Sequence, residues 1–210
     1  MFANVLSQSA QTALAVLGKS GVIADGYLAG ESAFALHFGH RISEDFDFFS
    51  SKEFEPAMLS NKLSEAGEFV EEKAIGITLL GTFNTVKFSY FEYNYPLVAS
   101  TTTFSNVSIA HPHDIAAMKL VAITDRGTKR DYIDLFEITR QNISFDTMFS
   151  LYDQKYKKLQ TKIFTLIKAL TYFDEADKTD MPQMLTPVSW GKVKQFFVSE
   201  SMRLARKYLE

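Results

Sequence analysis

An acid–apolar–acid triplet, Asp45-Phe46-Asp47, runs directly into the aromatic pair Phe48-Phe49. This pattern fits a β-strand, on which residues i and i+2 share a face, so the two carboxylates point the same way. Like charges at that spacing repel each other unless a cation lies between them. Mg²⁺, or Mn²⁺ in its place, is the expected ion, because it binds one or two carboxylates together with substrate phosphates. The alternative is a solvated strand face that carries two acids, since Asp-x-Asp is a short pattern.

The segment before the triplet predicts a phosphate-binding turn. Residues 25–29 are expected to form a strand, and residues 30–38 a short helix. Gly30 and Ser32 lie in the turn that opens this helix. Such a turn offers backbone N–H groups and the positive end of the helix dipole, which suit a phosphate.

The order of these features is the one that nucleotidyl transfer requires. A phosphate cradle comes first, and a metal-binding pair follows about fifteen residues later. The cradle holds a nucleoside triphosphate, and the metal bridges its phosphates and the acids. Arg41 and Ser43 lie just before the acid pair and are further candidates for phosphate contact. Alternatively, these two residues only shape the turn.

Two ordered blocks carry a resemblance to a known family. The first is LAGESAFAL at residues 28–36 followed by HRISEDFDFF at 40–49, and the second is HDIAAMK at 113–119, Arg126, and KRDYIDL at 129–135. Together they resemble the nucleotidyltransferase AbiEii/AbiGii toxin family, in the minimal-nucleotidyltransferase group of the DNA polymerase β superfamily. The resemblance is clear over about residues 20–140 and weak from 141 onward.

The resemblance implies a minimal-nucleotidyltransferase fold: an α/β (α+β) chain with a mixed β-sheet flanked by helices and a helical C-terminal half. It implies an enzyme that moves a nucleotidyl group from a nucleoside triphosphate to an acceptor, either RNA such as tRNA or a protein. The biology would be that of the toxin of a toxin–antitoxin or phage-defence system. The expected partners are the triphosphate, RNA and a cognate antitoxin, and the expected cofactor is Mg²⁺ or Mn²⁺.

Further site residues follow from the second block. Lys119 is expected to neutralise phosphate, with Arg126 and Arg130 beside the same phosphates. Asp131 either orients a Lys or Arg or serves as a base. Asp134 comes three residues later on the expected helix, so the two acids share one face. The alternative for Lys119 is a solvent-exposed lysine on a helix. The alternative for Arg130, Asp131 and Asp134 is an internal salt bridge that joins the helices to the sheet.

The chain departs from the family pattern at two positions. Glu31 occupies the turn where the family usually carries a second glycine, and a carboxylate there repels a triphosphate unless it points away. Ser89 stands where many members carry a third acid on a later strand. Glu92 falls on the opposite strand face, so it is a poor substitute without a bulge. A catalytically degenerate protein that binds nucleotide or a partner is therefore the first rival hypothesis, and a small-molecule, antibiotic-type nucleotidyltransferase is the second.

Composition sets wider limits. The chain has 210 residues, 46% of them hydrophobic, which predicts a substantial core. The absence of cysteine excludes disulfides and fits the cytoplasm. We expect no signal peptide and no transmembrane helix. We expect an α/β core over residues 1–110 and a helical region over 111–210.

Charge is distributed unevenly along the chain. Residues 141–210 carry 11 Lys and Arg against 8 Asp and Glu, whereas residues 1–140 carry 11 against 17. A mildly basic C-terminal part is suited to RNA, although a solvated helical surface gives the same count.

Periodicity and turn residues predict the remaining elements. Helices are expected at 2–18 with a stop at Gly18, and at 55–66, 112–126 and 129–140, and strands at 44–50, 68–74, 77–82 and 84–93. An extended piece is expected at 103–110, followed by three or four helices after residue 144 that are interrupted at 174–180.

Overall fold

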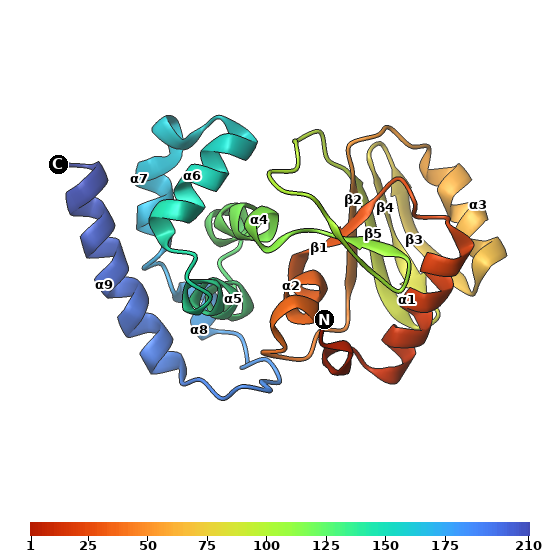
Figure 1. Cartoon of the computed structure of the whole chain (residues 1–210), viewed down its shortest axis with the longest axis horizontal. Coiled ribbons are helices and arrows are strands. Elements are labelled where there is room, and N and C mark those ends of the chain that lie inside the picture. Colours follow the sequence, from red (N-terminus) through yellow and green to blue (C-terminus); the bar gives the residue numbers. More distant parts are fainter. The chain divides into compact units, whose positions relative to one another are not determined.

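The computed structural model describes all residues from 1 to 210, and they divide into two compact units, Met1–His111 and Pro112–Glu210. The first unit holds every strand of the protein, and the second is helical (Figure 1). No helix combines the length and the apolar character that a bilayer crossing requires.

A seven-stranded mixed sheet forms the first unit, with the strand order β3-β4-β5-β2-β1-β7-β6. β2 is parallel to β5 and antiparallel to β1, and β1 is parallel to β7. The pairs β3/β4, β4/β5 and β6/β7 are antiparallel. The strands are β1 (Tyr27–Ala29), β2 (Phe46–Ser50), β3 (Phe69–Ile75), β4 (Thr78–Phe83), β5 (Val86–Glu92), β6 (Thr102–Phe104) and β7 (Val107–Ile109).

Aromatic side chains on alternate strand positions build the core of this unit. Phe46 and Phe48 are fully buried on β2, and the Phe48 ring lies 5.4 Å from Phe88 and 6.4 Å from Tyr90 on β5. Because side chains alternate between the faces of a strand, the residues between these aromatics face the other way. That opposite face carries Asp47.

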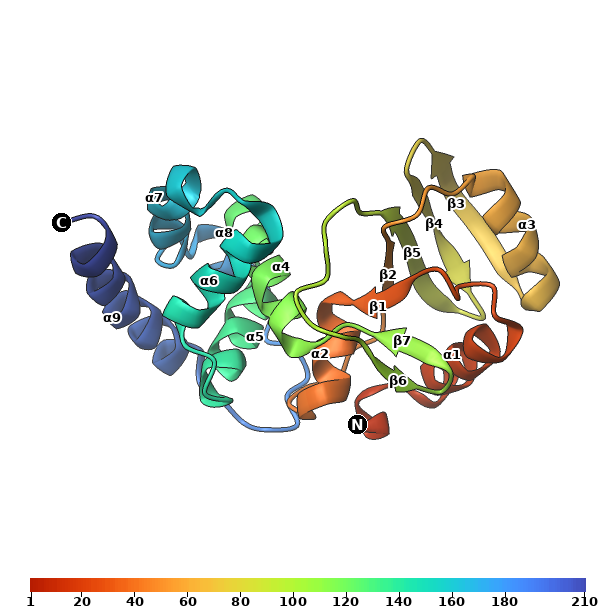
Figure 2. The same ribbon diagram turned by 45° about the horizontal axis from the view of Figure 1, so that its top comes forward.

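Helices cover the sheet. α1 and α3 contact each other and the sheet, and both ribbon views show them on one side of it (Figures 1 and 2). α2 contacts β1 and β2. The helical elements of this unit are the 3₁₀ turn η1 (Ala3–Val5), α1 (Gln8–Ser20), α2 (Gly30–Phe38) and α3 (Pro56–Ala66).

The second unit is a bundle in which α4 contacts α5, α6 and α7. Tyr132 on α5 is buried in its centre, and its hydroxyl donates to the carbonyl oxygen of Ala169 at 2.7 Å. The helices are α4 (Pro112–Asp125), α5 (Lys129–Arg140), α6 (Phe145–Tyr156), α7 (Leu159–Ala169), α8 (Asp174–Asp177) and α9 (Trp190–Tyr208).

Asp146 in the first turn of α6 binds three side chains at the C-terminal end of α9. Its carboxylate accepts hydrogen bonds from Lys207 Nζ at 2.6 Å and Tyr208 Oη at 2.8 Å, and lies 2.8 Å from Arg203 Nη2. Burial acts to raise the pKa of Asp146, but these three donors outweigh it and lower the pKa to about 2.

The predicted stop at Gly18 is wrong. α1 continues to Ser20 and ends at Gly21, which has the left-handed φ of 72° that a helix terminus favours. Gly18 is instead a site of close packing, because a Cβ there would lie 1.9 Å from the carbonyl oxygen of Ser105.

Two other predicted segments differ from the structure. The single extended piece at 103–110 is a hairpin, β6 and β7, that reverses at Ser105 and Asn106 with φ of 50° and 60°. A two-residue turn with both φ positive matches the twist of a hairpin, although it more often carries glycine. The interruption at 174–180 contains the short helix α8.

Candidate functional site

Gly30 joins β1 to α2 beside Asp47. Its φ is 65°, in the left-handed region that glycine tolerates best. An added Cβ would lie 3.0 Å from Asp47 Oδ2. A side chain at this position would therefore press on the carboxylate of Asp47 as well as strain the backbone.

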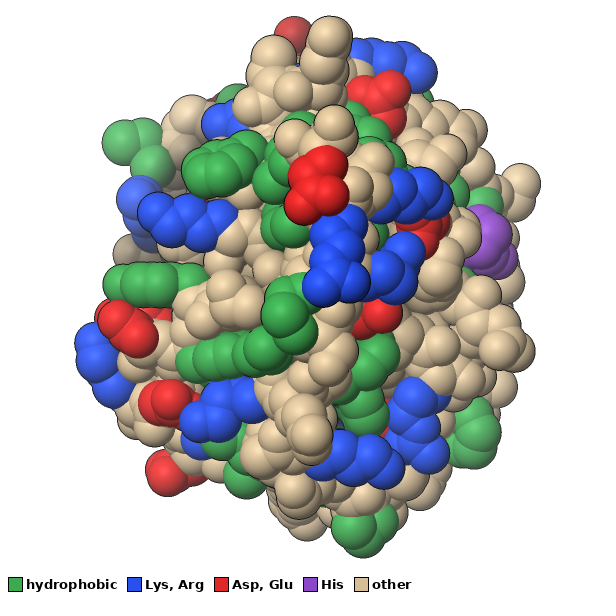
Figure 3. Space-filling model, turned by 90° about the vertical axis from the view of Figure 1, so that its left-hand side faces the viewer, with side chains coloured by type: hydrophobic (Ala, Val, Ile, Leu, Met, Phe, Trp, Pro, Cys, Tyr) green, Lys and Arg blue, Asp and Glu red, His purple; other side chains and the backbone are tan.

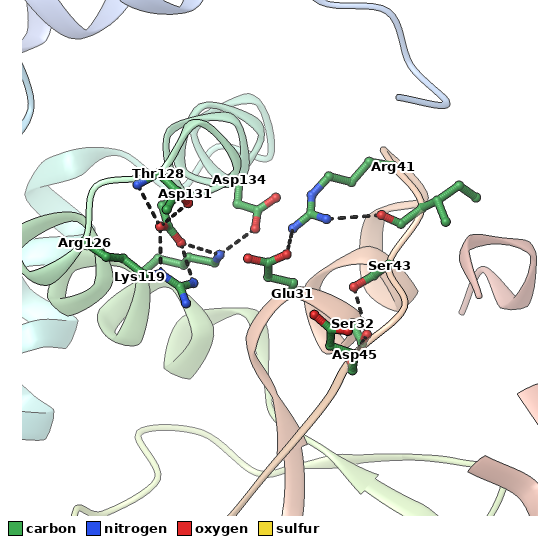
Figure 4. A network of polar contacts seen from close by, with 11 residues as sticks. Glu31, Ser32, Arg41, Ser43, Asp45, Lys119, Arg126, Thr128, Asp131 and Asp134 are labelled. Carbon is green, nitrogen blue, oxygen red and sulfur yellow. Dashed lines mark hydrogen bonds and ion pairs between the residues drawn. The ribbon is translucent and has the colours of Figure 1, made fainter. Parts of the chain in front are cut away.

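Ser32 fixes the backbone that carries the acid pair. It is fully buried, and its hydroxyl donates to the carbonyl oxygen of Asp45 at 2.5 Å (Figure 4). Ser32 Oγ also lies 2.9 Å from Ser43 Oγ, and the backbone N–H of Ser43 donates to the carbonyl of Val5 at 2.9 Å. Both serines expected at phosphate thus hold the loop before β2 in place.

Glu31 is paired with Arg41. Glu31 Oε2 lies 3.0 Å from Arg41 Nη2, and only 1% of the Arg41 side chain is exposed (Figure 4). Arg41 Nη1 also donates to the carbonyl of Ile42 at 3.1 Å. The carboxylate that conflicted with a phosphate cradle in the sequence is therefore balanced by a buried guanidinium.

Asp45 and Asp47 lie on either side of the buried Phe46, and both are partly exposed. β2 begins at Phe46, so Asp45 immediately precedes the strand. The alternation expected from the sequence is observed along β2, where the buried positions are 46, 48 and 50.

Ser89 is the neighbour of Asp47 on the adjacent strand. In the parallel pairing of β2 with β5, Asp47 stands beside Ser89 and Phe49 beside Phe91. The rings of Phe49 and Phe91 lie 5.4 Å apart, so these register partners share a face. Glu92 stands beside Ser50, on the other face, and β5 has no bulge that would turn it round. Glu92 does not replace the third acid, as expected.

The donors present fit one hard divalent cation that completes its shell with phosphate and water. No group of three or more His, Asp or Glu in residues 1–210 is arranged to hold a metal ion. Two carboxylates remain, from Asp45 and Asp47, and oxygen ligands of this kind are those that Mg²⁺ and Mn²⁺ prefer.

Lys119 anchors a buried cluster in the second unit. Its ammonium lies 3.0 Å from Asp131 Oδ1 and 2.7 Å from Asp134 Oδ2, and 3% of its side chain is exposed (Figure 4). The i, i+3 spacing did predict that both acids share one face of α5. Lys119 is therefore not the solvent-exposed helix lysine that the sequence left as the alternative to phosphate binding. The internal salt bridge expected as the alternative for Asp131 and Asp134 is present, but it joins α4 to α5 and not a helix to the sheet.

Asp131 accepts from three residues. Arg126 donates through Nε and Nη2 at 2.9 Å each, and Thr128 through its backbone N–H at 3.2 Å and its hydroxyl at 2.7 Å. Burial acts to raise the pKa of Asp131, but the charge of Lys119 and the bonds from Arg126 and Thr128 hold it well below its usual range. A general base works best with a pKa near the operating pH, so the structure favours the orienting role for Asp131.

The arginines of this unit are exposed. Arg126 keeps 55% of its side chain accessible while it binds Asp131, and Arg130 is exposed on α5. Phosphate contact by either residue stays a prediction.

Two lysines were not selected from the sequence. Lys155 on α6 is buried and forms an ion pair with Asp114 on α4 at 2.8 Å. The sequence did contain a sign of this burial, because Lys155 falls on the apolar side of the helix, where a charged residue needs a partner. Lys87 lies on the same face of β5 as Ser89, two residues earlier, is exposed, and has no ion pair with a carboxylate.

Comparison with known families gives a match over more than half of the chain. The model of the family described as "Nucleotidyl transferase AbiEii toxin, Type IV TA system" matches residues 92–204. The match includes the Lys119 cluster, and it continues over residues 141–204, where the resemblance read from the sequence was weak. It begins after the acid pair.

Similar proteins cover nearly the whole chain. The uncharacterized protein aq_aa25 of Aquifex aeolicus is 34% identical over 213 residues, which span 98% of both chains. Among solved structures, JHP933 from Helicobacter pylori has a TM-score of 0.56 at 16% identity and covers 97% of this chain and 94% of its own. MenT4, a nucleotidyltransferase toxin of Mycobacterium tuberculosis, has a TM-score of 0.54 at 14% identity, covering 95% and 89%. The predicted nucleotidyltransferase fold is confirmed.

Proposed function

Because the chain belongs to the AbiEii nucleotidyl transferase toxin family, we propose that it transfers a nucleotidyl group from a nucleoside triphosphate to an RNA acceptor, as the toxin of a toxin–antitoxin system. The observation that carries the proposal is the close approach of the partly exposed Asp47 carboxylate to Gly30 at the N-terminus of α2, with the partly exposed Asp45 two residues earlier and held through its carbonyl by Ser32. A helix N-terminus attracts phosphate, and paired carboxylates attract the cation that accompanies it.

Residues around the acid pair prepare it for an anionic substrate. Asp45 and Asp47 would hold Mg²⁺ or Mn²⁺, which when bound supplies the charge that stabilises a triphosphate during in-line displacement. Gly30 keeps the first turn of α2 open for phosphate oxygens. Ser32 positions Asp45 through its carbonyl, and Ser43 supports Ser32.

Arg41 makes Glu31 compatible with this site. An unbalanced carboxylate in the first turn of α2 would repel phosphate, and the buried guanidinium 3.0 Å away cancels that charge. Of the two departures from the family pattern, Glu31 therefore gives no support to a degenerate site.

In the helical unit, we assign Lys119 and Asp131 to positioning. Lys119 holds Asp131 and Asp134, and Asp131 orients Arg126 through a bidentate contact. Arg126 and Arg130 would present exposed guanidinium groups to phosphate, for which arginine is well suited.

The surface of α7 and α9 supports RNA as the acceptor. α7 contains no acid, and the one acid of α9, Glu200, is bound to Arg203. Lysine and arginine side chains are spread over the face that α9 occupies (Figure 3). Exposed cations without an acidic partner favour a phosphate backbone, through contacts that weaken as salt rises. On these two helices they are Lys162, Lys168, Lys192 and Arg206.

Calorimetry with each of the four nucleoside triphosphates in the presence of Mg²⁺ tests the proposal. We expect metal-dependent binding by the native protein and none by the variant Asp45→Asn/Asp47→Asn. Glu44→Gln removes a neighbouring exposed acid and is the matched control, which should bind like the native protein. Absence of binding by the native protein would contradict the proposal.

The acceptor is tested next with the nucleotide that binds. Transfer of its α-³²P label to purified tRNA or total RNA, lost in the same double variant, would support an RNA acceptor. Label appearing in protein instead would identify the other acceptor class. A cognate antitoxin, which we propose as partner, should restore growth of cells that express the active protein.

A degenerate, nucleotide-binding protein is the second candidate, and Ser89 favours it. Ser89 stands beside Asp47 where a further acid would complete a two-cation site. Nucleotide binding that is never followed by transfer to RNA or protein would favour this candidate.

A further inference from the structure

The acid pair has no carboxylate neighbour across the sheet. Asp47 stands between Ala29 on β1 and Ser89 on β5, its register partners on either side. A second cation bridged to the first would need a further oxygen ligand of negative charge, and neither neighbour offers one.

Lys87 is the positively charged residue on the strand beside Asp47, two residues before Ser89, where a third carboxylate is missing. It shares the partly exposed face of β5 with Ser89 and Phe91, the face that the contact between the Phe49 and Phe91 rings assigns also to Asp47. β2 and β5 run parallel, so Lys87 precedes Ser89 as Asp45 precedes Asp47. Lys87 and Asp45 therefore lie at the same end of the two strands.

The side chain of Lys87 is long enough to reach a ligand bound at Asp45 and Asp47 on the neighbouring strand. Neighbouring strands lie about 4.8 Å apart and successive residues on one face are separated by about 6.6 Å along the strand. A lysine ammonium on its four-carbon stem can span this separation, as a mobile point charge. Lys87 forms no ion pair within residues 1–210, so the ammonium is not committed to another partner.

We propose that the nucleotide site works with a single divalent cation, held by Asp45 and Asp47, and that Lys87 supplies the second positive charge by contacting the triphosphate. The inference rests on the proposed nucleotidyl transfer. In that reaction the acceptor hydroxyl oxygen forms a bond to the α-phosphorus, and its proton is lost to water. The bond from the α-phosphorus to the oxygen that bridges to the β-phosphorus breaks. Pyrophosphate leaves with the electron pair, and Lys87 stabilises its charge.

The test counts bound cations. Electron paramagnetic resonance measures the Mn²⁺ bound to the full chain at saturating α,β-methylene triphosphate of the base chosen by calorimetry. We expect one Mn²⁺ per native chain and two per Ser89→Asp chain, in which a third carboxylate stands beside Asp47. Circular dichroism confirms that the variant is folded.

A second set of variants tests Lys87 itself. Lys87→Met should weaken binding of the analogue about tenfold, a loss typical of one charge-assisted contact. Lys73→Met removes another exposed lysine of the same sheet, on β3, and should leave binding unchanged. In Lys87→Met/Ser89→Asp the second cation should restore the affinity, because it replaces the lost charge.

The outcomes separate this inference from the function on which it rests. No binding of the analogue by the native chain would overturn both. Binding with two Mn²⁺ per native chain, or equal affinity of Lys87→Met and native protein, would overturn only the role of Lys87 and leave nucleotidyl transfer standing.

Discussion

Replacing Asp131 by Asn should destabilise the helical unit by about 3–5 kcal/mol at pH 7, the usual cost of breaking a buried ion pair from one side. The carboxylate is fully buried and accepts from Lys119, Arg126 and Thr128. An asparagine amide keeps the volume but removes the charge and replaces one acceptor by a donor. Lys119 then keeps Asp134 as a partner, which places the expected cost toward the lower end of the range.

The destabilisation should depend on pH with a definite sign. The pKa of Asp131 is held well below its ordinary value of 3.8, so its contribution to stability is complete above about pH 4. As the pH falls from 4 toward 2, Asp131 of the unchanged protein takes up a proton in the unfolded state but not in the folded state. The contribution of Asp131 to the free energy of unfolding therefore declines. The difference in stability between the native chain and Asp131→Asn should therefore narrow over that interval.

Trp190 provides the assay. It is the single tryptophan of the chain, and its ring lies 5.7 Å from that of Tyr132, the residue after Asp131. Urea unfolding followed by tryptophan fluorescence thus reports on the helical unit. Asp125→Asn, an exposed acid at the end of α4, is the control and should change stability by less than about 0.5 kcal/mol. A loss below about 1 kcal/mol for Asp131→Asn, or a difference that stays constant with pH, would refute the reasoning.

Three further predictions concern single residues. Gly30→Ala should weaken nucleotide binding in calorimetry, because its Cβ would meet the carboxylate of Asp47, and the variant should still unfold cooperatively in a melting experiment. Gly18→Ala should lower the melting temperature even though alanine favours a helix by about 1 kcal/mol, since the Cβ would overlap a backbone oxygen; Gly191→Ala in α9, whose Cβ would meet only Ser189 Oγ at an ordinary 3.9 Å, should not. Asp146→Asn should flatten the fall in stability between pH 4 and 2, because the Asp146 pKa of about 2 lies below its ordinary 3.8; an unchanged urea-midpoint profile would contradict this.

Local signals were enough to predict most elements. The helix at residues 30–38 was placed correctly, because Gly30 and Gly39 mark its two ends with φ of 65° each. α5 was also placed correctly over 129–140. The β6–β7 hairpin was missed because its turn, Ser105 and Asn106, adopts positive φ without a glycine to signal it.

Some features of the candidate site were also predictable from the sequence, and others were not. The acid–apolar–acid pattern predicted the alternation of β2, and the position of Ser89 beside Asp47 matched the expectation for the missing acid. The pairing of Glu31 with Arg41 and the use of Ser32 to hold Asp45 were not readable, because both depend on how the loop after α2 folds back.

By itself the sequence determined most of the elements, the nucleotidyltransferase fold through its resemblance, and the alternation that exposes Asp47 on β2, because these depend on neighbours within a few residues or on ordered motifs. Only the tertiary structure decided which charges are internal. Asp114 and Lys155 lie 41 positions apart and meet at 2.8 Å, and Lys119 meets Asp131 across two helices. The free energy of burying a charge depends on the partner that packing brings to it, and packing joins residues whose separation in the chain carries no signal.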